Sequence, residues 1–168
     1  MFEAALLALV GAAALTGAIY DLTTFTIPNW ISLALLALFP VLALAAGLSL
    51  SDAGLHLAVG AAALAVGIAL FAGGIVGGGD AKLFAALALY MGVQSIAPYV
   101  FAVAVTGGAL AVTLLVLRST ALSVLFIRLP WMHKLSSPGV GVPYGVAIAA
   151  GGLMALPATQ LFALASAT

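Results

Sequence analysis

The chain has 168 residues, of which 66% are hydrophobic and 5% are charged, and its formal net charge is zero. Because about a quarter of the residues of a soluble domain are charged, this composition excludes a water-soluble globule and indicates an integral membrane protein. The balanced charge gives no indication of nucleic acid as a partner, and the absence of cysteine excludes disulfides, thiolate nucleophiles and cysteine-based metal sites.

Six apolar runs come close to the length of about 20 residues that a transmembrane helix needs. They cover residues 4–20, 30–47, 55–73, 81–97, 99–117 and 141–159. Strands are not indicated, because the runs are rich in Ala and Leu and show no alternation of apolar and polar residues. The first run lacks a basic N-terminal flank, so we expect a retained span rather than a signal peptide. We predict an all-α polytopic membrane protein, a bundle of about six helices forming a single domain over residues 1–168.

The first connection contains Asp21 at its start and Pro28 and Asn29 at its end. A carboxylate costs about 2.5 to 3.5 kcal/mol at the centre of a membrane helix, and less toward the interface, so such residues are often functional. Pro28 suits the first turn of the second helix, where its missing N–H costs nothing. The alternative is that Asp21 is an ordinary acid of an interfacial loop.

The third connection ends with three glycines, Gly77, Gly78 and Gly79, followed by Asp80 and Lys82. Glycine permits backbone conformations closed to other residues, and non-helical backbone at membrane depth occurs only where it lines water or is buried in protein. We therefore expect a wet cleft with Asp80 at its wall. The alternatives are that Asp80 only caps the fourth helix and that Lys82 only anchors the topology.

The basic residues predict the orientation of the bundle. Lys82 lies in the third connection and the other three basic residues lie in the fifth, so all four share one side of the membrane. The positive-inside bias places that side in the cytoplasm and the N-terminus outside. Asp21 and Asp80 then both face the cytoplasm at similar depth and could meet.

Two carboxylates within hydrogen-bonding distance would titrate as a coupled pair, as in aspartic proteases, where one accepts a proton from water and the other donates one. His133 with these two acids would make a weak metal set, so no metal site is predicted. His56 is expected at the opposite interface, and residues 121–134 are expected to form an interfacial helix. Tyr144 follows the fifth connection and could reach the cleft, although an interfacial aromatic is the alternative.

At these residues the chain resembles the type IV prepilin peptidases, the GxGD class of intramembrane aspartyl proteases, and most closely their short form from tight-adherence (Flp-type) pilus systems. The matching segments, in family order, are Asp21 with Ile27-Pro28-Asn29, then Gly77-Gly78-Gly79-Asp80-Ala81-Lys82-Leu83, and then Pro143-Tyr144-Gly145-Val146-Ala147. The resemblance implies that Asp21 and Asp80 are the catalytic pair. Residues expected to bind substrate or support the site are Gly77, Gly78, Gly79, Lys82, Pro28, Asn29 and Tyr144.

The resemblance also implies a partner and a location. The substrate would be a prepilin whose short basic leader is cut after a glycine, before its hydrophobic helix, at the cytoplasmic face of a bacterial or archaeal cell membrane. No cofactor is expected, and methyltransferase activity with S-adenosylmethionine is not predicted, because longer relatives carry a cysteine-containing segment that this chain lacks. The alternative function is a small proton- or cation-coupled transporter using the same carboxylates, although the two halves show no internal repeat. The oligomeric state does not follow from the sequence.

Overall fold

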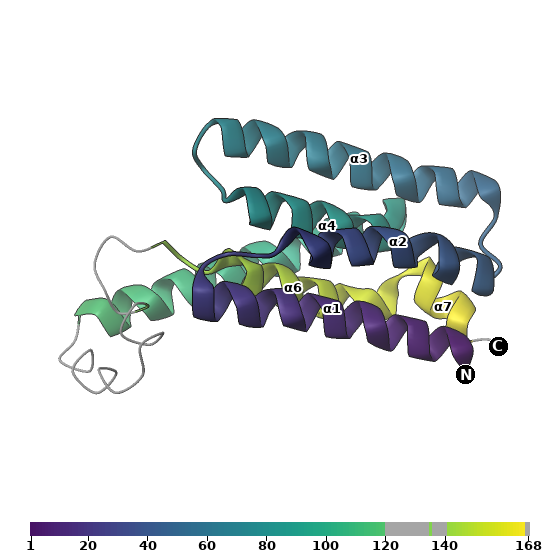
Figure 1. Cartoon of the computed structure of the whole chain (residues 1–168), viewed down its shortest axis with the longest axis horizontal. Coiled ribbons are helices and arrows are strands. Elements are labelled where there is room, and N and C mark those ends of the chain that lie inside the picture. The colour runs from purple at the N-terminus through teal and green to yellow at the C-terminus, as the bar shows by residue number, and fades with distance from the viewer. Residues whose placement is uncertain (120–134, 136–140, 167–168) are drawn as a thin grey trace.

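The computed structural model describes residues 1–119, 135 and 141–166, and these form a bundle of helices without strands (Figure 1). The elements are α1 Phe2–Thr24, α2 Asn29–Ala45, α3 Leu50–Ala72, α4 Gly78–Ser119, α6 Tyr144–Ala155, η2 Leu156–Ala158 and α7 Gln160–Ser166. The prediction of an all-α membrane bundle is confirmed for this part of the chain. The predicted interfacial helix over 121–134, with Arg128, His133 and Lys134, lies outside the described residues.

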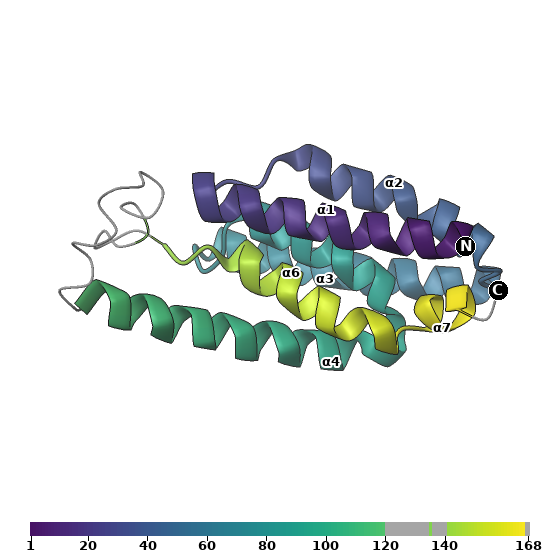
Figure 2. The same ribbon diagram turned by 90° about the horizontal axis from the view of Figure 1, so that it is seen from below.

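Three of the described helices, α1, α3 and α4, are long and apolar enough to cross a membrane. Helix α2 is shorter, and α6 with η2 is followed by α7 across a bend of 54°. Helix α4 turns back on itself, so that its two arms run along the bundle in opposite directions (Figure 2). Each of the six apolar runs therefore corresponds to a helix or to one arm of α4.

The turn within α4 lies at Gly92, whereas the sequence suggested a boundary at Pro98. Gly92 has φ 60° and ψ −171°, and Pro98 lies inside the second arm. Only glycine adopts this conformation readily, because a Cβ atom would clash with the backbone. The His56 ring fills the space beside it, since a Cβ on Gly92 would lie 2.6 Å from His56 Cε1. His56, expected at an interface, is buried and its Nδ1 lies 2.7 Å from the Leu89 carbonyl oxygen.

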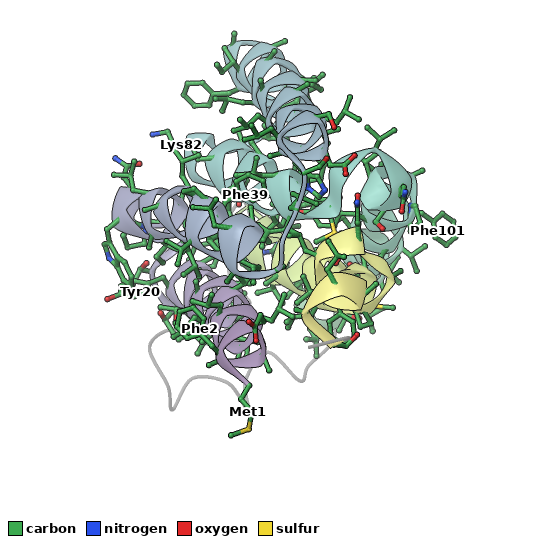
Figure 3. The ribbon with its side chains drawn as sticks, turned by 90° about the vertical axis from the view of Figure 1, so that its right-hand side faces the viewer. Met1, Phe2, Tyr20, Phe39, Lys82 and Phe101 are labelled. Atoms are coloured by element: carbon green, nitrogen blue, oxygen red, sulfur yellow. The ribbon has the colours of Figure 1, made fainter. Side chains whose placement is uncertain are left out.

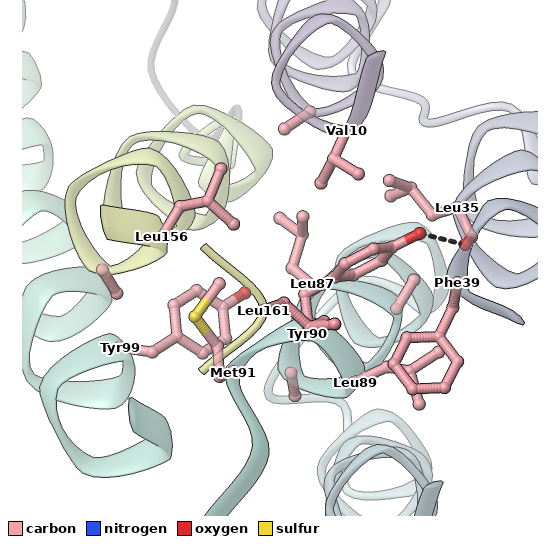
Figure 4. Packing of buried hydrophobic residues seen from close by; sticks show 14 of the residues in the cluster. Val10, Leu35, Phe39, Leu87, Leu89, Tyr90, Met91, Tyr99, Leu156 and Leu161 are labelled. Carbon is pink, nitrogen blue, oxygen red and sulfur yellow. Dashed lines mark hydrogen bonds between the residues drawn. The ribbon is translucent and has the colours of Figure 1, made fainter. Parts of the chain in front are cut away.

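The core lies between α1, α2, α6 and the first arm of α4 (Figure 4). The hydroxyl of Tyr90 donates a hydrogen bond to the carbonyl of Leu35, which ties the first arm of α4 to α2. Tyr99 of the second arm stacks on Phe84 of the first, with ring centroids 4.9 Å apart. These contacts fix both arms of α4 and therefore fix the position of the helix start that carries Asp80.

One end of the bundle gathers the end of α1 and the starts of α2, α4 and α6 (Figure 1). The N-terminus, the start of α3 and α7 lie at the other end. There Ser49 caps α3 by accepting a hydrogen bond from the Asp52 N–H, and Gln160 donates to Asp52 at 3.2 Å. Asp52 and the two other aspartates, Asp21 and Asp80, thus lie at opposite ends of the bundle.

Candidate functional site

Asp21 lies in the last turn of α1 and is 5% exposed. Its Oδ2 accepts a hydrogen bond of 2.7 Å from the Gly145 N–H. Gly145 is the second residue of α6, where backbone N–H groups have no acceptor within the helix and the helix dipole favours an anion. The start of α6 therefore supplies the donor that holds this buried carboxylate.

Asp80 is the third residue of α4 and is half-buried. Its carboxylate accepts a hydrogen bond from the Gly77 N–H, while the Gly77 carbonyl accepts one from the Ala81 N–H at 3.0 Å. An acid at this helical position that binds the preceding N–H is half of a capping box. Capping therefore accounts for part of the role of Asp80, and its partial exposure leaves the carboxylate accessible to other groups.

The three segments that carry these residues meet around Ile27. A Cβ atom on Gly79 would lie 3.0 Å from Ile27 Cβ, and one on Gly145 would lie 2.8 Å from Ile27 Cδ1 and 2.9 Å from Asp21 Oδ2. The connection from α1 to α2 thus packs directly against the starts of α4 and α6, and these contacts leave no room for side chains at the two glycines. Asp21 and Asp80 are therefore carried by segments that pack against one another at this end of the bundle.

Lys82 and Asn29 lie away from the carboxylates. Lys82 follows Asp80 by two positions, which on a helix is a rotation of about 200°. Its Nζ donates a hydrogen bond of 2.9 Å to Asn29 Oδ1, and both residues line a groove of about 530 Å³ between α2, α3 and the first arm of α4. This groove, which we name the Lys82 groove, contains neither aspartate among its lining residues. Pro28 is the N-cap of α2 rather than a residue of its first turn.

A second groove, which we name the Asp80 groove, has a volume of about 560 Å³ and lies between α3, both arms of α4 and α6. Its lining is apolar except for Asp80 and Tyr144. Tyr144 is the first residue of α6, and its ring packs on Gly107, where a Cβ would lie 2.8 Å from the Tyr144 hydroxyl oxygen. The structure therefore places Tyr144 and Asp80 on the same groove.

Among the remaining glycines, Gly77 packs against the carboxylate of Asp80, because a Cβ there would lie 2.8 Å from Asp80 Oδ2. A Cβ on Gly78 would lie 3.3 Å from the Phe71 ring, so Gly78 serves the packing of α4 on α3. Sequence reasoning named neither Gly145 nor Ile27 as a site residue. Both lie within the motif segments. For Gly145, the available signal was its place directly after the residue that begins α6.

The arrangement can perform acid–base chemistry with two carboxyl groups, one buried against a helix start and one at an apolar groove. Two interacting carboxyl groups readily share one proton, so one of them can act as a base and the other as an acid. Within the described ranges, no three His, Asp or Glu side chains are grouped closely enough to hold a metal ion.

In a comparison with protein families, residues 7–112 match the model of the type IV leader peptidase family. The matched region is more than half of the chain and includes Asp21, the three consecutive glycines and Asp80. No curated protein and no solved structure gives a significant match.

Proposed function

Since the chain belongs to the type IV leader peptidase family, it is a membrane peptidase that acts on prepilins, and we propose that Asp21 and Asp80 are its catalytic pair. The observation that supports this most is the position of two acids, 59 positions apart in the sequence, on segments that pack around Ile27 at one end of the bundle. The family match gives no support to the transporter alternative.

In the proposed reaction the ionised carboxylate accepts a proton from a water molecule, whose oxygen forms a bond to the carbonyl carbon of the peptide. The protonated carboxyl group donates its proton to the leaving nitrogen as the C–N bond breaks. Afterwards the two aspartates have exchanged protonation states, so the pair is ready for another cycle with the roles reversed. Either residue can therefore begin as the base.

We further propose that the cut is made at the cytoplasmic face, so that the leader is removed inside the cell. Helix α4 begins near Lys82 and ends near Arg118, and both of its ends lie at the end of the bundle where α1 ends (Figure 1). Basic residues favour the cytoplasmic side of a membrane. Arg118 donates hydrogen bonds to the carbonyls of Leu135 and Gly141, close to the start of α6. A basic leader would leave the site on this side, and the N-terminus of the peptidase would face outward.

The test is the replacement of each aspartate by asparagine, Asp21→Asn and Asp80→Asn, with a co-expressed tagged prepilin as substrate. Loss of either acid–base group should lower the rate of leader removal at least about a hundredfold. The readout is the shift in prepilin mass, with membrane insertion of the variants checked by fractionation.

The matched control is Asp52→Asn, which changes an acid at the opposite end of the bundle and should leave cleavage unchanged. If Asp21→Asn and Asp80→Asn both still remove the leader at the wild-type rate, the aspartyl mechanism is wrong, although the family membership would stand.

A further inference from the structure

The Asp80 groove has two apolar walls that are open to the surrounding membrane. One wall is the face of α3 that carries Ala62, Val66 and Leu70, and the other is the second arm of α4 with Val100. Val66 is 59% exposed and Val100 is 47% exposed, so no other described helix covers them. The residues of α3 that line the groove run from position 59 to position 70, about 16 Å along the helix axis.

The groove is continuous with the proposed catalytic pair, because Asp80 itself is one of its lining residues. Any substrate whose peptide bond lies at Asp80 must continue away from the carboxylates along some surface. Asp21 offers no such path, because it is 5% exposed and lies behind Gly145 and Ile27. An apolar lining of this length, about half of the thickness of the hydrocarbon core, suits an apolar helix.

The walls also suit a helix because they include small residues. Ala62, Ala63 and Gly67 lie on the groove side of α3, and Ala81 lies on its floor. Small side chains let membrane helices approach closely, and the resulting van der Waals packing is one of the forces that associate helices in lipid. Gly67 and Ala81 already use this closeness to pack α3 on α4, since a Cβ on Gly67 would lie 2.9 Å from Ala81 Cβ.

The Lys82 groove is the competing surface and lies on the other side of the first arm of α4. Figure 3 shows Lys82 on one side of the bundle and Phe101 of the second arm on the opposite side. The Lys82 groove has nearly the same volume, about 530 Å³, but neither aspartate lines it. The two grooves therefore differ in their continuity with Asp80 and not in their volume.

We propose that the Asp80 groove binds the apolar membrane-spanning segment of the substrate directly beside the bond that is cut. This inference rests on the proposed function, because it takes Asp80 as a catalytic group. It assigns to α3 and to the second arm of α4 the role of holding the substrate helix, with Asp80 and Tyr144 at the polar end of the groove.

The test uses two neighbouring alanines of α3, because Ala62 lines the Asp80 groove and Ala61 lines the Lys82 groove. Both side chains are exposed, so each position should accept a larger residue. Ala62→Phe should lower the rate of cleavage of a co-expressed full-length prepilin about ten- to a hundredfold. This is the effect expected when the new ring prevents one large apolar side chain of the substrate from being buried in the groove. Ala61→Phe should change the rate less than about twofold.

A truncated substrate separates the groove from the chemistry. A peptide with the leader and a few residues after the cut, without the apolar segment, should be cleaved equally by the wild type and by Ala62→Phe. Equal losses for Ala61→Phe and Ala62→Phe, or a loss confined to Ala61→Phe, would overturn the groove assignment. If Asp80→Asn still cleaves prepilin at the wild-type rate, the catalytic role proposed above for Asp80 fails, and this outcome is distinct from the others.

Covalent modification of the folded enzyme avoids any failure of Ala62→Phe to fold. The chain has no cysteine, so Ala62→Cys and Ala61→Cys each introduce a single thiol. Benzyl methanethiosulfonate should block prepilin cleavage only for Ala62→Cys. In a second experiment Ala62→Cys is combined with Asp80→Asn, so that prepilin binds without being cut, and the bound prepilin should protect the thiol from modification. Protection at position 61 instead, or protection by lipid or by a second copy of the enzyme without prepilin, would contradict the proposal.

Discussion

At the scale of single residues, the site depends on a backbone donor as much as on side chains. The Gly145 N–H lies 2.7 Å from Asp21 Oδ2 in a buried position. A hydrogen bond to a charged group is stronger than one between neutral groups, and burial increases its effect. Gly145 can supply it only because it has no side chain, since a Cβ would come within 2.9 Å of the same oxygen.

Gly145→Ala should therefore impair catalysis without removing a catalytic group. The added methyl group has to displace either Ile27 or the carboxylate of Asp21, and the weakened hydrogen bond should lower kcat about ten- to a hundredfold. The measurement is the rate of prepilin cleavage at saturating substrate, with thermal unfolding of the purified enzyme in detergent measured in parallel.

Gly108→Ala is the control for this substitution, because a Cβ on Gly108 meets nothing within 4 Å. It should retain full activity and equal or slightly greater stability. If Gly145→Ala cleaves prepilin as fast as Gly108→Ala does, the contact between Gly145 and Asp21 does not matter for the reaction.

At the scale of elements, helix α4 carries the most unusual local structure, because one glycine turns it back along the bundle. Gly92→Ala should lower the free energy of unfolding by about 2 kcal/mol or more, since alanine at φ 60° is strained and its Cβ would also collide with the His56 ring. Thermal unfolding in detergent measures the effect. Gly54→Ala, in the exposed first turns of α3, should instead be neutral or stabilising by about 0.5 to 1 kcal/mol. Equal stability of the two variants would show that alanine fits the turn at position 92 without strain.

The position of this turn also shows where sequence reasoning ends. Pro98 is a strong local signal for a helix boundary, yet it is accommodated inside the second arm. Gly92 has no such signal, because a single glycine among apolar residues also suits plain helix packing. What selects Gly92 is the buried His56, which approaches from another helix and bonds to the Leu89 carbonyl. A contact between residues 33 positions apart is not visible in a local pattern.

At the scale of the whole molecule, composition and run lengths were enough to predict the helical membrane bundle, because both reflect the cost of polar groups in lipid. The motifs also indicated the two aspartates as a pair. The sequence could not show that Asp21 is held by an N–H 124 positions away, or that Lys82 turns toward Asn29 and away from Asp80. Those features depend on the packing of α1, α4 and α6 against one another.

The orientation of the bundle in the membrane can be tested with single cysteines in the cysteine-free chain. Ser51→Cys lies at the start of α3 and Ile75→Cys lies in the connection to α4, at opposite ends of the bundle, and both side chains are exposed. A membrane-impermeant maleimide should label Ser51→Cys in intact cells and label Ile75→Cys only after permeabilisation. The reason is that the end with Lys82 and Arg118 should face the cytoplasm. The reverse labelling pattern would place Asp21 and Asp80 on the outer side, where a leader retained in the cytoplasm could not reach them.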